Sequence, residues 1–257
     1  MDKGIIDSGS VNIDKREGVA HIEFYHPMSN SLPGKILSEL VAAIMSSGED
    51  SDVNVLVLRS AGEKAFCGGA SFEELSSIEN LEQGKKFFSG FANVINACRK
   101  CSKIIIGRVQ GKAVGGGVGL ASATDYCLAT DNAAVKLSEL AVGIGPFVVG
   151  PVVERKIGIS AMSQLAIDAT NWQSAAWAKE KGLYAEIYES IEQLDKAVEN
   201  MSIRLANSNP VALKSLKNAF WQGTEHWDEL LLKRAEISGH LVLSDFTKNA
   251  IEAFKRK

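Results

Sequence analysis

The sequence lacks the features that mark several large classes of protein. Its 257 residues contain no uninterrupted run of about 18 apolar residues, so we expect no membrane-spanning helix. The formal net charge is −3, so the chain has no excess of positive charge to attract nucleic acid or anionic membranes, and we expect neither as a partner. The first residues show neither the basic nor the apolar region of a secretory signal. These absences favour a cytoplasmic protein that binds neither nucleic acid nor a membrane.

Cysteine and histidine are both scarce, with four residues of each. In a cytoplasmic domain of this size we expect reduced thiols rather than disulfides. Cys98 and Cys101 form a C-x-x-C, but no second ligand pair or thioredoxin-like context accompanies them, so we interpret them as ordinary cysteines. The histidines show no metal-ligand spacing, and neither G-x-S-x-G nor H-E-x-x-H occurs. A metal site and a serine-hydrolase site are therefore not expected.

Alternating strands and helices are predicted over most of the chain. Apolar periodicity predicts strands at 19–24, 53–58, 104–109 and 126–129, and helices around 36–44 and 87–95. Such alternation is typical of an α/β layered architecture. Helical patterns then dominate, over 191–207, 210–222, 227–243 and 245–255. We therefore divide the chain into an α/β core, residues 1–200, and a helical region, residues 201–257, that packs on the core or on a neighbouring subunit. We interpret the four tryptophans as packing residues: Trp172, Trp177, Trp221 and Trp227.

Glycine is the residue in surplus, with 23 where an average usage of ~7% would give about 18. Six glycines fall within 13 residues between Gly107 and Gly119, directly after a predicted strand. A second loop, Phe66-Cys67-Gly68-Gly69, follows the strand at 53–58. Backbone N–H groups at the carboxyl ends of strands suit a negatively charged ligand or a developing oxyanion. We expect the two loops to converge on one small atom; tight helix packing is the alternative for the longer loop.

These segments carry a specific resemblance. Residues 65–71 (Ala-Phe-Cys-Gly-Gly-Ala-Ser) and 110–120 (Gln-Gly-Lys-Ala-Val-Gly-Gly-Gly-Val-Gly-Leu) resemble the paired signature of the crotonase (enoyl-CoA hydratase/isomerase) superfamily. Segments 26–32, 137–146 and 209–214 resemble other motifs of that family, in the right order. The resemblance runs from about residue 12 to the end. It implies a crotonase-like spiral of ββα units with a C-terminal helical region that covers the CoA site, and a homotrimer or hexamer.

The resemblance also implies the chemistry. The substrate would be an acyl-CoA thioester, with no metal and no cofactor besides the CoA of the substrate. By motif, the N–H groups of Gly68 and Gly116 would hold the thioester oxygen, and Glu139 would be the catalytic base. A wider set of residues would contact the substrate: Ser29, Asn30, Leu32, Lys64, Phe66, Ala70, Phe72, Gly115, Gly119, Pro146, Phe147, Phe254 and Lys257.

One departure from the family pattern decides which reaction we expect. Hydratases of this family usually carry a second glutamate at the position of Gly119, which has no side chain here. Hydration uses two carboxylates naturally, whereas one carboxylate suits a 1,3-proton shift. The sequence therefore resembles the single-glutamate Δ3,Δ2-enoyl-CoA isomerases. A raised pKa is expected for Glu139 in its acyl pocket, and residues 73–84 are expected to shape that pocket.

The sequence is also consistent with other functions. The chain is alternatively a hydratase, including the methylglutaconyl-CoA type, with Glu139 working alone or helped by Glu73, Glu74 or Asp125. Decarboxylation of a malonyl-type thioester is a third reaction, in which the oxyanion site does most of the work. An inactive CoA-binding homologue is the alternative outside catalysis.

Overall fold

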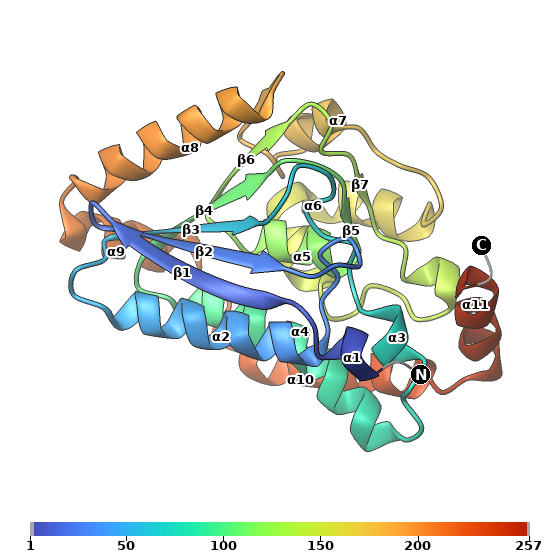
Figure 1. Ribbon diagram of the computed structural model, residues 1–257. Coiled ribbons are helices and arrows are strands. Elements are labelled where there is room, and N and C mark those ends of the chain that lie inside the picture. The colour runs from blue at the N-terminus through green and yellow to red at the C-terminus, as the bar shows by residue number, and fades with distance from the viewer. Residues whose placement is uncertain (1–2, 256–257) are drawn as a thin grey trace.

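The computed structural model describes residues 3–255 and is built around one six-stranded sheet (Figure 1). Its strand order is β1-β2-β3-β4-β6-β8; β1 pairs antiparallel with β2, and every other pair is parallel. A second sheet contains only β5 and β7, in parallel. The strands are β1 (Ser10–Arg16), β2 (Val19–Tyr25), β3 (Val55–Ser60), β4 (Ile104–Val109), β5 (Ala113–Val114), β6 (Tyr126–Thr130), β7 (Val135–Lys136) and β8 (Glu186–Tyr188).

Helices cover both faces of the large sheet. On one face lie α2 and α4, and α10 packs against α4 on the side away from the sheet; α8 lies across the other face (Figure 1). The longer helices are α2 (Gly34–Glu49), α4 (Leu81–Lys100), α6 (Gly150–Ile167), α8 (Ile191–Ala206), α9 (Pro210–Phe220), α10 (Trp227–Leu241) and α11 (Asp245–Lys255). The shorter ones are α1 (Lys3–Ile6), α3 (Phe72–Leu75), α5 (Gly116–Ser122), α7 (Ala175–Glu180) and the 3₁₀ helix η1 (Leu140–Val142).

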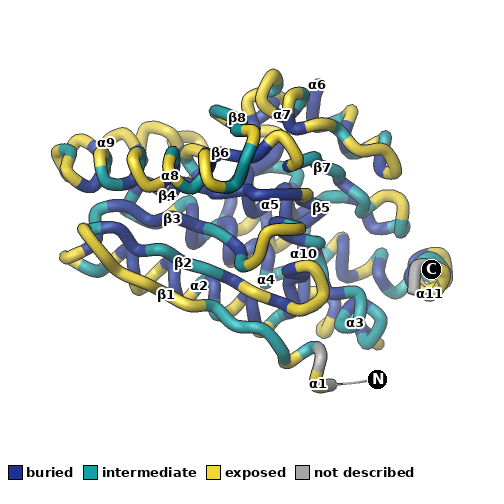
Figure 2. Tube along the Cα trace, turned by 45° about the horizontal axis from the view of Figure 1, so that its top comes forward, coloured by how far each residue is buried: buried dark blue, intermediate teal, exposed yellow. Residues whose placement is uncertain are grey.

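The alternation of side chains along the strands explains the two layers. In β3, Leu56 and Leu58 join the larger apolar core on the side of α2 and α4, whereas Val55 and Val57 face α8. Both sets are fully buried, as expected for a parallel sheet covered on both faces. Figure 2 shows the central strands β3 and β4 as a buried layer, with exposed segments on the outer helices and on β1.

The predicted elements agree with the structure in kind and closely in extent. All four strands and the helices of the C-terminal region are confirmed, although the helix predicted over 227–243 ends at Leu241. β1, the two short strands of the second sheet and α6 were not predicted from the sequence. No helix within residues 3–255 is long and apolar enough to cross a membrane.

The cysteines are buried free thiols, as expected. Burial raises the pKa of the Cys98 thiol to about 12, and it also raises the pKa of the Cys101 thiol. The reactive thiolate is therefore disfavoured at both positions of the C-x-x-C. Among the described residues, no group of three or more His, Cys, Asp or Glu side chains is placed to hold a metal ion.

Candidate active site

The two glycine loops meet, as the sequence predicts. Gly69 has φ +89°, and a Cβ atom added to it would lie 2.8 Å from Val114 O and 3.7 Å from Gly116 N. Only a residue without a side chain lets the loop after β3 approach the loop before α5 this closely. A backbone ladder holds the approach, because Val114 N donates to Cys67 O and Cys67 N donates to Lys112 O.

The expected hydrogen-bond donor in the first loop is corrected by the structure. The N–H of Gly68 donates to the carbonyl oxygen of Ser29 at 2.8 Å, so it is not available to a ligand. Two residues further on, Ala70 lines the same cavity as Gly116 and Glu139. No described residue accepts a hydrogen bond from the N–H of Ala70 or of Gly116. The pair of free donors at this site is therefore Ala70 and Gly116.

Glu139 lies directly beside this pair of loops, just before η1. Its Oε1 would be 3.0 Å from a Cβ atom placed on Gly115, which has φ +51° and is the N-cap of α5. Its Oε2 is buried and has no hydrogen-bond partner among residues 3–255. Burial raises the pKa of the Glu139 carboxyl to about 7, because the hydrogen bond from its own backbone N–H offsets the lost hydration of the charge only in part. The expected raised pKa is thus confirmed, and such a carboxyl is poised to take and return a proton near neutral pH.

A small apolar cavity of about 40 Å³ adjoins the Glu139 carboxyl. Apolar side chains from two segments line it: Phe88 and Phe91 of α4, and Pro146, Phe147, Val148 and Val149. Ala70 and Gly116 line it from the two glycine loops, and Gly145 and Ser238 of α10 are the remaining lining residues besides Glu139. Buried aromatic and aliphatic walls around one acidic group suit a carbon acid whose proton is removed away from water.

A larger cavity, of about 500 Å³, lies on the other side of the first loop. It shares Ala70 with the small cavity and is also lined by Gly68, Ser29, Phe72 and Lys112. Trp172 stands at this cavity with two ammonium groups against its ring: Lys112 Nζ is 4.8 Å and Lys136 Nζ 4.6 Å from the ring centre. Burial and the charge of Lys112 lower the pKa of Lys136. Two neighbouring cations make this end of the site attractive to a multiply charged anion.

Several residues expected to touch the substrate instead hold the loops in place. The Asn30 side chain is buried and donates to Ala61 O and Ala65 O, at 2.9 and 3.0 Å. Leu32 N donates to Gly69 O, and the Phe66 ring packs edge-on against Phe24 in the core. Lys64 is exposed and lines neither cavity. None of these four residues lines either cavity, and three of them hold the loops or pack in the core; a direct contact of Lys64 with the substrate stays a prediction.

The position of Gly119, where hydratases of the family usually carry a glutamate, has no room for a side chain. A Cβ atom on Gly119 would lie 2.4 Å from Cγ1 and 2.8 Å from Cβ of Val149, which is buried at the start of α6. Real Cβ atoms do not approach this closely. Gly119 therefore does not line the cavity, and the room for a side chain at this position is filled by Val149.

None of the three carboxylates considered as a second acid lies in the cavity with Glu139. Glu73 lines the larger cavity and accepts a hydrogen bond from Ser71 Oγ, while Glu74 accepts one from Gly34 N. Asp125 is buried elsewhere, paired with Lys217 at 2.7 Å and with Trp221 Nε1 at 2.7 Å. Glu139 is thus the only carboxylate lining the small cavity among the described residues.

Several other features of the site were not predicted from the sequence. Residues 73–84 were expected to shape the acyl pocket; none of them lines the small cavity, although Glu73 lines the larger one. Phe88 and Phe91 were recognised only as part of an apolar helical stripe, and nothing in the sequence marks Val149. Trp172, interpreted as a packing residue, is 39% exposed at the larger cavity. The side chain of Phe254 and the whole of Lys257 lie outside the described residues.

Ala70, Gly116 and the buried carboxyl of Glu139 line one cavity of this α/β fold, and comparison with known proteins identifies the family. The family model described as enoyl-CoA hydratase/isomerase matches residues 14–257. The chain is 29% identical to the short-chain-enoyl-CoA hydratase of Clostridium acetobutylicum, over 98% of this chain and 97% of that protein. It is 27% identical to the carnitinyl-CoA dehydratase of Escherichia coli K12, over 83% and 80%.

Solved structures give the same fold. An enoyl-CoA hydratase from Bacillus halodurans superposes with a TM-score of 0.87 at 20% identity, covering 95% of this chain and 99% of that one. An enoyl-CoA hydratase/isomerase from Xanthobacter autotrophicus Py2 superposes with a TM-score of 0.87 at 22% sequence identity. The match covers 96% of this chain and 93% of that one. The chain has the crotonase spiral fold, and it belongs to the enoyl-CoA hydratase/isomerase family of acyl-CoA enzymes.

Proposed function

We propose that this enzyme isomerises 3-enoyl-CoA to 2-enoyl-CoA, with Glu139 as its single acid–base group. The observation that carries the proposal is the contact of Val149 with Gly119, because it fills the place of the second carboxylate that hydration uses. Glu139 is left as the one carboxylate lining the small cavity among residues 3–255. A single carboxylate that removes a proton at one carbon and returns it at another is sufficient for this reaction.

The proposed reaction is a 1,3-proton shift. The Glu139 carboxylate removes a proton from C2 of the 3-enoyl thioester, and the electron pair moves onto the thioester oxygen to form a dienolate. The N–H groups of Ala70 and Gly116 hydrogen-bond to this oxygen and stabilise its developing charge. The Glu139 carboxyl then returns the proton at C4, and the double bond forms between C2 and C3. Glu139 ends the cycle ionised, as it began.

The two cavities divide the substrate between them. We place the acyl group in the small apolar cavity beside Glu139 and the CoA moiety in the larger cavity, with the thioester at Ala70, which lines both. The phosphates of CoA then lie toward Lys112 and Lys136, whose ammonium groups flank Trp172. Charge complementarity favours this orientation over the reverse, since no lysine or arginine described by the structure lines the small cavity.

Hydration of 2-enoyl-CoA is the second candidate. It is favoured by the name of the relative from Clostridium acetobutylicum, a short-chain-enoyl-CoA hydratase that matches almost the whole chain. On this alternative, Glu139 would both activate the water and deliver the proton. The absence of a second carboxylate from the small cavity, within the described part of the chain, argues against high hydratase activity.

Product analysis tests the proposal. The purified enzyme is supplied separately with 3-butenoyl-CoA and (E)-2-butenoyl-CoA, and the products are identified by chromatography and mass. We expect conversion of the first to the second, with little 3-hydroxybutyryl-CoA from either. Fast formation of the hydroxy product would favour the hydratase instead.

We also propose a homotrimer or hexamer and a cytoplasmic location, both from the family resemblance. Light scattering tests the oligomeric state, and cell fractionation tests the location.

A further inference from the structure

The cavity beside Glu139 sets the length of acyl chain that the site accepts, provided that the acyl group lies there as proposed above. The cavity beside Glu139 measures about 40 Å³. One water-sized group needs ~10–15 Å³ of such a cavity, so there is room for about three groups of that size. A second, separate cavity of about 640 Å³ lies between α2, α3 and α4, and none of the residues lining it lines the small one.

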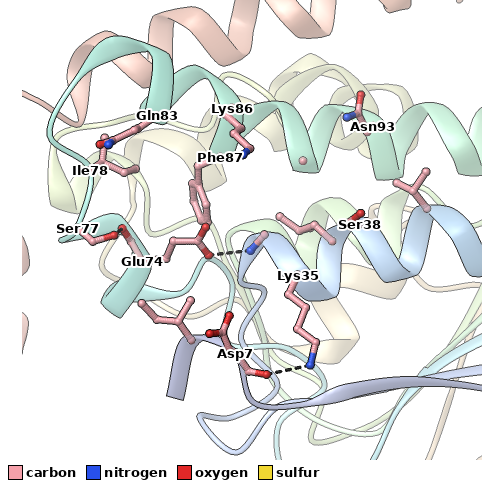
Figure 3. A pocket seen from close by; sticks show the side chains of 15 residues that line it. Asp7, Lys35, Ser38, Glu74, Ser77, Ile78, Gln83, Lys86, Phe87 and Asn93 are labelled. Atoms are coloured by element: carbon pink, nitrogen blue, oxygen red, sulfur yellow. Dashed lines mark hydrogen bonds between the residues drawn. The ribbon is translucent and has the colours of Figure 1, made fainter. Parts of the chain in front are cut away.

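Helix α4 forms the wall between these two cavities. Phe88 and Phe91 line the small cavity, whereas Phe87 and Gly90 line the large one. Figure 3 shows the Phe87 side chain pointing from α4 toward Glu74, whose carboxylate accepts a hydrogen bond from Gly34 N. The side chains of one helix turn therefore face two different spaces.

Two aromatic rings in mutual contact lie between the cavities, because Phe91 lines the small one and Phe87 lines the large one. The rings of Phe87 and Phe91 meet edge to face, with their centres 5.7 Å apart. On the other side of Phe91 lies the oxyanion site, since Phe91 Cε1 would be only 2.3 Å from a Cβ atom on Gly116. The Phe91 ring thus fills the space directly behind the proposed thioester, and the Phe87 ring closes the gap behind Phe91.

We propose that the Phe91–Phe87 ring pair limits the enzyme to short acyl chains, of about four carbons. The groups beyond the thioester carbon fill the small cavity and then meet Phe91. A longer chain has no path to the large cavity while both rings are in place. Phe91 and Phe87 are therefore residues that determine chain-length specificity. The two N–H groups hold the thioester in a fixed place, so the depth of the cavity beyond it determines how long an acyl chain can bind.

Binding of saturated acyl-CoA esters tests the inference without any turnover. Butyryl-, hexanoyl-, octanoyl- and decanoyl-CoA are titrated calorimetrically into the wild type, Phe91→Ala and the double variant Phe87→Ala/Phe91→Ala. Wild type should bind octanoyl-CoA ~10-fold or more weakly than butyryl-CoA, as expected of a pocket that cannot hold added methylenes. The double variant joins the cavities and should bind octanoyl-CoA at least as tightly as butyryl-CoA.

Leu37→Ala is the matched control. Leu37 lines the large cavity but not the small one, so its truncation enlarges the former without joining them, and the wild-type order should persist. Thermal melts confirm that each variant folds; if Phe91→Ala does not, Phe91→Leu is used with the same expectation. Equal binding of all chain lengths by wild type, or an unchanged order in the double variant, would overturn the inference. Failure to isomerise 3-butenoyl-CoA would instead contradict the proposed reaction and leave these binding results interpretable.

Discussion

Val149 occupies the space that a side chain at Gly119 would need. The Cγ1 atom of Val149 lies 2.4 Å from the position of a Cβ atom on Gly119, which is far inside van der Waals contact. A glutamate at position 119 would therefore clash with Val149. Testing a second carboxylate at this position requires replacing Val149 as well.

Exchanging this pair should introduce hydration. The double variant Gly119→Glu/Val149→Gly removes the obstructing side chain and supplies a second carboxylate, so 3-hydroxybutyryl-CoA should form from 2-butenoyl-CoA. Gly119→Glu alone should be destabilised by ~1–3 kcal/mol or more through overpacking and gain no hydration. Val149→Gly alone is the control and should remain an isomerase. If the single Gly119→Glu variant folds with wild-type stability, the close contact does not restrict this position.

Removing the charge from Glu139 should abolish most of the activity. Glu139→Gln retains the shape but cannot move a proton, so kcat for isomerisation should fall by ~10²–10⁴-fold. The variant should still bind butyryl-CoA, because the two N–H groups and both cavities are unchanged. Glu79→Gln, an exposed residue of the same type, should behave as wild type. Activity within a few-fold of wild type in Glu139→Gln would mean that another group moves the proton.

The raised pKa of Glu139 predicts two opposite responses to pH. The base must be ionised, so kcat/KM should rise with pH and level off above about 7. Stability should move the other way. Between the ordinary value of 4.5 and about 7 the folded protein binds more protons at this group than the unfolded chain, so stability falls as pH rises through this window.

Differential unfolding of wild type and Glu139→Gln measures the stability effect. A shift from 4.5 to about 7 corresponds to a cost on the order of 3 kcal/mol to ionise the buried group. The stability advantage of Glu139→Gln over wild type should therefore grow between pH 5 and pH 8. An advantage that stays constant over this range would show that Glu139 ionises in the folded protein as easily as in the unfolded chain.

The lysines beside Trp172 should act on the CoA moiety alone. Lys112→Ala and Lys136→Ala should each raise KM for acyl-CoA with little change in kcat, because they bind the ground state and the transition state equally. Added salt should reduce the difference from wild type. Lys233, whose side chain is 75% exposed on α10, provides the control variant Lys233→Ala. A fall in kcat at constant KM would place these lysines in the chemical step.

The sequence predicts the sheet and the loops of the site because both depend on local patterns. Apolar runs such as 104–109 form buried strands, and Gly69 lies in a loop where the close approach of another backbone requires glycine. Gly116, at the start of α5, has no room for a side chain because the Phe91 ring packs against it. Glu139 was found through a motif that occupies one continuous segment. What the sequence could not predict depends on contacts between distant segments.

Two errors show this limit. Gly68 and Ala70 are equally plausible donors in the motif, and only the hydrogen bond from Gly68 to Ser29, 39 residues earlier, removes Gly68 from the pair. Likewise Val149 resembles any buried valine until its contact with Gly119 is known. The size of the acyl cavity depends on how α4 packs, and a helical stripe of phenylalanines does not reveal which ring faces which space.

Transfer of an isotopic label tests most directly whether Glu139 alone carries the proton. The substrate is 3-butenoyl-CoA carrying deuterium at C2, and the (E)-2-butenoyl-CoA product is analysed by NMR after a small extent of reaction in ordinary water. Because one enclosed carboxyl takes the proton and returns it, a substantial fraction of the product should carry transferred deuterium at C4. Product formed at full rate with no deuterium at C4 from the first turnovers onward would contradict a single enclosed base.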